Sequence, residues 1–333
     1  IVTLFLQGSY RRSTAIRPHK DTRADVDLVV VTRLSQDEYT PSEAMEVFRP
    51  FLDKFYPDKY RFQGRSIGIE LSYVDIDLVI TSAPSESEVG ILESESVITS
   101  ESLEDSDDWL PVKSWVSKAT RTNMESSWRL QEKARTEPEW TLSPLFIPDR
   151  DVESWEQTHP LEQIKWTWKK NRRCNGHYVN VVKALKWWRR VNHPLPKHPK
   201  GYPLEHLIGY ACPDGIGSVA EGVTKTLETI TCDPDFGFCA ALKISPSLAD
   251  HGVPEHNVFA RVPGEDFAAF FQQAKEAAVI ARHALDAESV EESAAGWRKL
   301  FGNKFPEPPN GNKGGYTPRS EKSILTSARP RFA

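Results

Sequence analysis

Cysteine is scarce in this chain, with four residues in 333 and no C-x-x-C pair. That scarcity excludes a disulfide framework and a zinc ribbon. Cys174 and His177 lie three residues apart, but a tetrahedral zinc site needs four ligands, and no matching pair follows nearby. We therefore expect reduced, mostly buried thiols at Cys174, Cys212, Cys232 and Cys239.

Long apolar runs are also missing. No stretch approaches the roughly 20 apolar residues that cross a bilayer. The opening residues lack a charged segment followed by a cleavage site. The sequence therefore predicts no membrane span and no secretion, and we expect a cytoplasmic protein. Because Ile1 stands inside an apolar run, we also expect the natural chain to extend before it.

Neither sign of charge is in large excess, since 42 Lys and Arg face 47 Asp and Glu. This balance excludes a uniformly basic nucleic-acid coat, and 39% hydrophobic residues exclude a disordered polymer. Nine acids and no basic residue fall within 84–110, so we expect a solvated acidic insertion near 84–108. The remaining 42 basic and 38 acidic residues suit an anionic ligand such as a nucleotide.

The first part of the chain has the pattern of an α+β sheet. Apolar and β-branched runs predict strands at 2–6, 25–32 and 66–81, the last as one long strand or two adjoining ones. Apolar residues at helical spacing predict a helix over 41–55, with Ser42 as its cap. The fold class expected here is a mixed sheet with flanking helices.

The second part is helical in pattern, with apolar residues three and four apart. Because single cores stop growing near roughly 250–300 residues, we expect two lobes. The expected domains are residues 1–150 with the acidic insertion, a helical lobe over 151–305, and an extended tail over 306–333. The helices expected in the second lobe cover 161–173, 177–192, 202–212, 267–285 and 290–301.

Paired acids on a buried strand are the strongest chemical signal. Side chains at i and i+2 of a strand share a face, so Asp25 and Asp27 are neighbouring carboxylates. Four apolar residues follow them, a context that fits two surface aspartates poorly because unpaired buried carboxylates are costly. A third acid, from Asp75-Ile-Asp77, would complete an oxygen cage for Mg²⁺. Asp77 is favoured because it precedes Leu-Val-Ile as Asp27 precedes Leu-Val-Val, and Asp75 is the alternative.

Gly8 and Ser9 follow the first strand and suggest a phosphate site beside this cage. A glycine lets the backbone approach a phosphate closely, and the serine offers an N–H and a hydroxyl. Two metal ions held by the acids would activate an attacking hydroxyl and stabilise leaving pyrophosphate. The combination predicts nucleotidyl transfer.

These residues resemble a known family, the bacterial cGAS/DncV-like nucleotidyltransferases (CD-NTases). The likeness lies in LFLQGSYRRSTAIRP, ADVDLVVVT and VDIDLVIT, and it continues through IPDRDVESWEQTHPLEQIKWTWKKN, VNVVKALKWW and GYPLEHLIG. It implies a polymerase-β-like palm and a helical lobe of oligoadenylate-synthetase type. It also implies synthesis of cyclic di- or trinucleotides from ATP or other NTPs in anti-phage (CBASS) signalling. The implied cofactor is a pair of Mg²⁺ ions, with Mn²⁺ as a substitute.

The resemblance also implies roles for individual residues. Gly8 and Ser9 would hold donor phosphates with Gln7 beside them, and Asp25, Asp27 and Asp77 would bind the metals. Lys186 matches the lysine of the family's K-x-W helix and would reach the triphosphate, although it also fits the solvated face of an amphipathic helix. Many relatives have a serine before the aromatic residue where this chain has Lys200-Gly201-Tyr202, so Lys200 would supply a charge there or be a loop lysine, and Tyr202 would also bind substrate.

Arginine and lysine residues between the glycine and the paired acids favour attraction of triphosphates. As partners, the resemblance implies NTPs and an activator protein encoded alongside, and nothing supports binding of double-stranded DNA. Two alternatives remain: a template-independent adenylyltransferase acting on RNA or a small molecule, and an inactive nucleotide-binding regulator. The basic residues of this connection are Arg11, Arg12, Arg17, Lys20 and Arg23.

Overall fold

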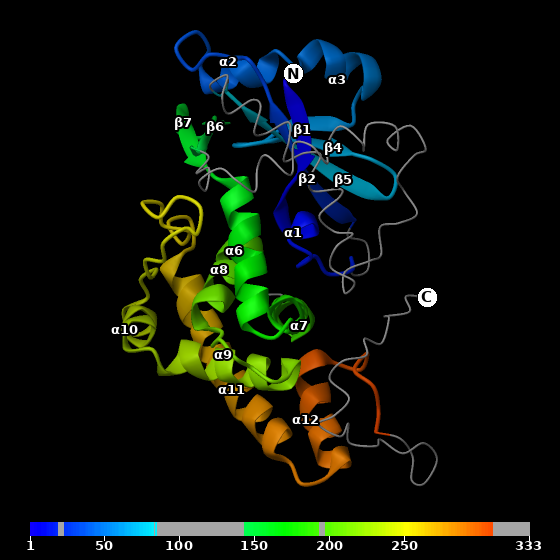
Figure 1. Cartoon of the computed structure of the whole chain (residues 1–333), viewed down its shortest axis with the longest axis vertical. Helices are drawn as coiled ribbons and strands as arrows, with labels where there is room; N and C mark the ends of the chain where they lie inside the picture. Colours follow the sequence, from blue (N-terminus) through cyan, green and yellow to red (C-terminus); the bar gives the residue numbers. More distant parts are fainter. Residues whose placement is uncertain (19–22, 83, 85–142, 193–196, 309–333) are drawn as a thin grey trace, which may run out of the picture.

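A sheet-based lobe and a helical lobe lie one above the other in the computed structural model (Figure 1). The structure describes residues 1–18, 23–82, 84, 143–192 and 197–308. The acidic insertion, apart from Pro84, and most of the expected tail lie outside the described residues, as does Lys20. Among the described residues, no helix is long and apolar enough to cross a membrane.

The sheet has five strands in the order β1-β2-β5-β4-β3. Its centre is the parallel pair β2 and β5, in which Asp25 stands opposite Asp75 and Asp27 opposite Asp77. The other pairs are antiparallel, so the sheet is mixed. The segment 66–81 forms two strands. The strands are β1 (Thr3–Leu6), β2 (Ala24–Val31), β3 (Tyr60–Phe62), β4 (Ile67–Glu70) and β5 (Val74–Thr81).

Two short helices, α2 (Pro41–Glu46) and α3 (Arg49–Phe55), cover one face of the sheet (Figure 1). The expectation of one helix over 41–55 was wrong. Pro50 has no N–H to donate to the preceding turn, so the helix restarts there. The cap was also misplaced: Thr40, not Ser42, accepts the Glu43 N–H in a capping box.

The other face of the sheet packs on the hairpin of β6 (Leu145–Asp149) and β7 (Ser154–Thr158) and on helix α6 (Pro160–Arg173). Val29 and Val31 of β2 share a core cluster with Leu161 and Ile164 of α6. This packing joins the two lobes through the start of α6. The boundary expected at residue 150 falls inside the hairpin, and the division into domains stays a prediction.

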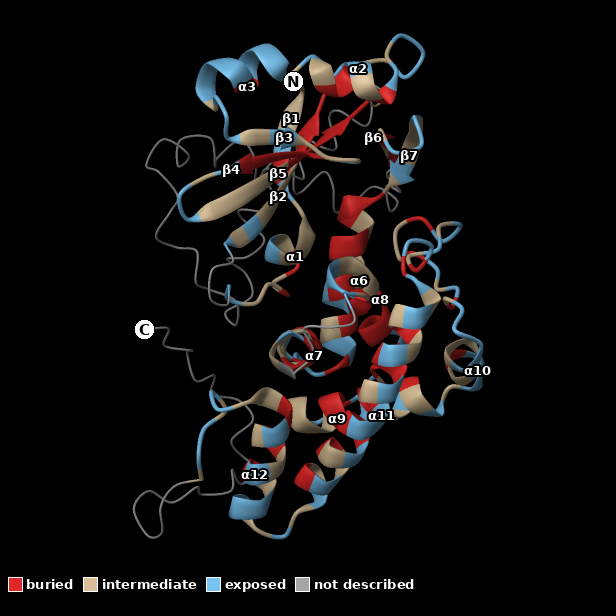
Figure 2. Ribbon diagram, turned by 180° about the vertical axis from the view of Figure 1, so that it is seen from behind, coloured by how far each residue is buried: buried red, intermediate tan, exposed pale blue. Residues whose placement is uncertain are grey.

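The helical lobe buries the larger core, and Figure 2 shows buried residues on the sides of its helices that face one another. The helices α9 (Val219–Cys232) and α10 (Pro234–Leu242) were not predicted. All four cysteines are free; Cys174 and Cys212 are buried, whereas Cys232 is exposed. The remaining helices are α7 (Tyr178–Asn192), α8 (Gly201–Ala211), α9 (Val219–Cys232), α10 (Pro234–Leu242), α11 (Gly264–Asp286) and α12 (Val290–Phe301).

Candidate active site

Three carboxylates converge at the junction of the two central strands. Asp25 and Asp27 of β2 and Asp77 of β5 each offer an oxygen, and these oxygens lie within 4.8 Å of one another. The grouping follows from the parallel register, which sets Asp27 beside Asp77, and from the two-residue repeat of a strand. Asp75, the alternative to Asp77, lies outside this group and pairs with Arg23 Nε at 2.9 Å.

Crowding of like charges perturbs all three acids. Burial, followed by the negative charges of Asp25 and Asp77, raises the pKa of Asp27 to about 6. Burial likewise raises the pKa values of Asp25 and Asp77, with further contributions from neighbouring acids. Gln63 Nε2 donates to Asp77 Oδ1 at 2.9 Å and offsets part of that shift. A divalent cation would relieve this repulsion, and oxygen-only donors are those that Mg²⁺ prefers, so the residues fit this ion.

Gly8 touches the acids through its backbone. It begins the short helix α1 (Gly8–Arg11), with Gln7 as the N-cap. Its φ is +67°, and a Cβ there would lie 1.7 Å from Asp27 Oδ2, so no other residue fits without displacing the carboxylate. The Gln7 N–H donates to the carbonyl oxygen of Asp27 at 3.0 Å, which fixes the turn against β2.

Ser9 stabilises the chain that follows this turn. Its carbonyl oxygen accepts the N–H groups of Thr14 and Ala15, at 2.8 and 3.0 Å. Residues 12–15 therefore fold back beside α1, and Arg12 and Thr14 lie next to the helical lobe.

Lys186 of α7 reaches from the helical lobe to the sheet-based lobe. Its Nζ donates to the carbonyl oxygen of Thr14 at 3.1 Å and to Glu205 Oε1 at 2.6 Å. Lys200 is exposed at the N-cap of α8. Tyr202 donates its hydroxyl to Asp250 Oδ2 at 2.5 Å, and its ring faces the guanidinium of Arg12 at 5.8 Å.

Glu205 was not predicted from the sequence, and the structure places it at this contact. Its carboxylate is buried and accepts from Arg12, Thr14 and Lys186. A signal was present: Glu205 stands among the apolar residues of α8, between Leu204 and Leu207. A lone acid on a buried helix face requires a partner, but the sequence does not say which one.

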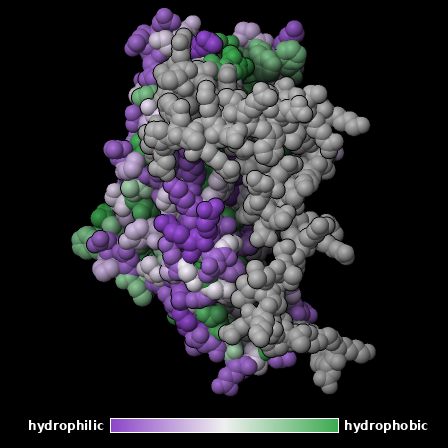
Figure 3. All heavy atoms as spheres, viewed as in Figure 1, coloured by the Kyte–Doolittle hydropathy of each residue, from purple (hydrophilic) through white to green (hydrophobic). Residues whose placement is uncertain are grey.

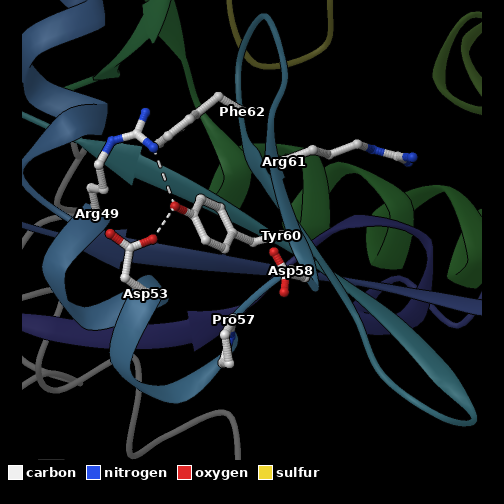
Figure 4. A pocket seen from close by; sticks show the side chains of 7 residues that line it. All are labelled: Arg49, Asp53, Pro57, Asp58, Tyr60, Arg61 and Phe62. Atoms are coloured by element: carbon white, nitrogen blue, oxygen red, sulfur yellow. Dashed lines mark hydrogen bonds between the residues drawn. The ribbon is translucent and has the colours of Figure 1, made fainter.

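A separate hollow lies between α3 and β3, and none of the three acids lines it (Figure 4). Tyr60 donates to Asp53 Oδ1 at 2.5 Å and accepts from Arg49 Nη1 at 3.2 Å. Because these polar groups satisfy one another, the hollow is stabilised by its own side chains.

Comparisons with known proteins agree with this geometry. Residues 1–86 match the family model described as Second Messenger Oligonucleotide or Dinucleotide Synthetase domain. A probable cyclic AMP-AMP-GMP nucleotide synthase from Salmonella paratyphi B is 51% identical over 326 residues, covering 95% of this chain and 84% of the relative. A cyclic AMP-AMP-GMP synthase from Enterobacter hormaechei subsp. hoffmannii (strain UCI 50) is 50% identical, covering 96% and 86%.

Solved structures of low sequence identity share the fold. Vibrio cholerae DncV, a cyclic AMP-GMP synthase, gives a TM-score of 0.61 at 13% identity, over 92% of this chain and 70% of that chain. E. coli MS115-1 CdnC, in its complex with HORMA-deltaN, gives 0.57 at 15% identity over 91% and 83%. These matches confirm the expected palm with its helical lobe. Together with the relatives of about half-identical sequence, they show that this chain is a nucleotidyltransferase and belongs to the bacterial cGAS/DncV-like family (CD-NTases) of cyclic oligonucleotide synthases.

Proposed function

We propose that this enzyme condenses ATP and GTP into cyclic AMP-AMP-GMP in a Mg²⁺-dependent reaction. The observation that carries the chemistry is the convergence of Asp25, Asp27 and Asp77 beside Gly8. The product is inferred from the two relatives named for cyclic AMP-AMP-GMP synthesis, which share 50% and 51% of their aligned residues with this chain.

Each proposed role follows from the position of the residue. Asp25, Asp27 and Asp77 would hold two Mg²⁺ ions, or Mn²⁺ in their place. When bound, the ions supply positive charge for the triphosphate and for the pyrophosphate that leaves. The turn at Gly8 and Ser9 lies directly against the Asp27 carboxylate, because glycine has no Cβ there, so donor phosphates bound at this turn would lie close to the acids.

The helical lobe supplies cations from the opposite side. Lys186 lies against Thr14, in the segment that follows Gly8 and Ser9. An ammonium at this position would attract a triphosphate. Lys200 is exposed at the start of the next helix and adds charge, whereas Tyr202 orients that helix through Asp250. The donor triphosphate would be held by Lys186, Lys200, Tyr202 and Gln7, the last at the cap of α1. A ribose hydroxyl then attacks the α-phosphorus, and pyrophosphate departs.

We further propose an activating protein partner and a role in anti-phage signalling. The support is the family membership and the solved complex of E. coli CdnC with HORMA-deltaN. Binding of a purified HORMA-domain protein, with a rise in product formation, is the expected observation.

Mass spectrometry of the product formed from the four NTPs and Mg²⁺ tests the proposed reaction. We expect a cyclic trinucleotide containing two adenylates and one guanylate, and its loss when EDTA is added. A product from ATP alone, or none under any activating condition, would contradict the assignment of the product.

Extension of RNA is the competing reaction to measure. Hydrophilic side chains gather over α6 on the face shown in Figure 3, and the exposed residues of this helix include Lys169, Arg172 and Arg173. Such charge would also attract an RNA backbone. A labelled RNA primer should remain unextended under conditions in which the cyclic product accumulates; extension would instead favour an RNA adenylyltransferase.

A further inference from the structure

Glu205 joins three segments of the chain with one buried carboxylate. Its Oε2 accepts from Arg12 Nε at 3.2 Å, Arg12 Nη2 at 3.1 Å and Thr14 Oγ1 at 2.9 Å. Its Oε1 accepts from Lys186 Nζ at 2.6 Å. One oxygen is thus anchored on the nucleotidyltransferase lobe, and the other holds a lysine of the helical lobe.

The charges around Glu205 are unequal, because two buried or nearly buried cations share one anion. Burial raises the pKa of Glu205, but the cations of Arg12 and Lys186 outweigh it and leave the pKa lowered. The carboxylate is therefore ionised at neutral pH. The excess positive charge lies near the three acids, since both Arg12 and Glu205 influence the pKa of Asp27.

The ammonium of Lys186 has three N–H donors. Glu205 and the carbonyl oxygen of Thr14 take two of them. A lysine side chain has about 2 kcal/mol of rotamer entropy to lose when it is fixed. In this structure the ammonium is already fixed by these two acceptors, and one donor remains for another acceptor.

We propose that Glu205 is a positioning residue that holds Lys186 in place for the nucleotide triphosphate. The inference rests on the proposed function, because it assumes that Lys186 binds phosphate. Its physical basis is preorganisation: a cation already held at its place loses less entropy when the anion arrives. Arg12 and Thr14 fix the orientation of the Glu205 carboxylate, and Glu205 fixes the ammonium.

Asp149 provides a matched control because it also links distant segments through a buried carboxylate. Its Oδ2 accepts from Arg65 Nε and from Arg261 Nη2, both at 2.5 Å. Its side chain is 0% exposed. Asp149 has no contact with Lys186 among the described residues, so Asp149→Asn disturbs a buried ion cluster without freeing the ammonium.

The test is a double-mutant cycle of Glu205→Gln and Lys186→Met, read as the Kd of a nonhydrolysable ATP analogue with Mg²⁺. If Glu205 acts through Lys186, the effects of the two changes on Kd are non-additive. The factor by which Glu205→Gln changes the Kd should then be at least fivefold smaller in the Lys186→Met protein than in the wild type. In kcat/KM, we expect Glu205→Gln to cost about tenfold and the double variant to lie within about threefold of Lys186→Met. Additive effects on Kd, or an unchanged Kd and kcat/KM in Glu205→Gln, would overturn the proposal.

Two further measurements separate a positioning role from a structural one. Asp149→Asn should lower Tm but leave Kd within threefold of the parent; an equal change in Kd would show that any buried ion cluster has this effect, and would overturn the proposal. The Kd cycle needs no product. If the wild-type protein forms no cyclic nucleotide, the proposed function fails, while non-additivity in Kd still supports the role of Glu205.

Discussion

At the scale of single residues, electrostatics sets the properties of the acidic cluster. Asp27 is the most perturbed of the three acids, because it is the most buried and has a carboxylate on either side. An isolated cluster of this kind destabilises the folded chain at neutral pH, and a bound cation reverses the effect. Replacing one of these acids by a neutral residue should therefore lower the activity and raise the stability of the metal-free protein.

Asp27→Asn should remove activity and stabilise the metal-free protein. The amide keeps the size of the side chain but removes one of the crowded charges, so we expect a Tm a few degrees higher in EDTA and at least a thousandfold lower kcat. Calorimetry and product chromatography measure the two effects. Asp75→Asn is the control, since Asp75 lies on the neighbouring strand β5 but outside the cluster; we expect activity within about fivefold of the parent. A lower Tm for Asp27→Asn would contradict this account.

The pH dependence of stability follows from the same shift. The pKa of Asp27 is about 6 in the folded protein, and an Asp in an unfolded chain titrates near 3.9. The folded state therefore binds more protons in this interval, and stability in EDTA should fall by about 2 kcal/mol as the pH rises from 4 to 6. Mg²⁺ should stabilise the protein increasingly over the same range, because it competes with protons for the carboxylates. Urea unfolding at several pH values measures both trends, and a flat profile in EDTA would contradict them.

At the scale of elements, the turn from β1 into α1 positions the backbone against the acids. Strands β1, β2, β4 and β5 could be predicted because apolar and β-branched residues dominate them over several positions, whereas β3, β6 and β7 were not predicted. Helix 41–55 was predicted as one piece because apolar spacing continues across Pro50, although the missing N–H interrupts the helix there. A Cβ at Gly8 has no room because α1 lies so close to Asp27 of β2. That distance depends on how the two elements pack.

Gly8→Ala should disable the site far more than an equivalent change elsewhere. Gly8 and Gly176 both have positive φ, but a Cβ at Gly176 meets nothing within 4 Å, whereas one at Gly8 meets the Asp27 carboxylate. Gly176→Ala should cost about 1 kcal/mol of stability and leave kcat/KM within twofold. Gly8→Ala should lower kcat/KM at least a hundredfold, because Asp27 or the turn must move. Equal losses in the two variants, measured by steady-state kinetics, would show that backbone strain alone matters.

At the scale of the whole molecule, contacts between distant segments hold the two lobes in their relative positions. Arg65 extends from the sheet lobe between β3 and β4, and Arg261 precedes α11 in the helical lobe; both bind the buried carboxylate of Asp149. The Glu205 contact is a second link, where residue 14 approaches α7 and α8. These contacts add to the packing of α6 on the sheet in holding the two lobes together.

Asp149→Asn should destabilise the whole protein. Asp149 is buried, but Arg65 and Arg261 are 44% and 55% exposed and can be solvated once the carboxylate is neutral. Loss of their hydrogen bonds to the charge should cost about 2 kcal/mol and lower Tm by about 4 °C. Glu228→Gln is the matched surface control, because the Glu228 pair with Arg282 is more than a third exposed on both sides. We expect that variant to shift Tm by less than about 2 °C. Similar shifts in the two variants would mean that Asp149 is not a principal link between the lobes.

Local pattern was sufficient to locate the paired acids, the glycine turn and most helices of the second lobe, though not α9 and α10, because strand alternation and helical spacing are properties of neighbouring residues. It left Asp75 and Asp77 as alternatives, since both point to the same side of one strand. Strand register and the pairing of Arg23 with Asp75 distinguish them, and the register forms only when β2 and β5 pair. Arg12 and Glu205 are 193 residues apart, and their contact requires both lobes to be folded and packed together. Interactions over such separations depend on the relative positions of whole elements, which no short stretch of sequence specifies.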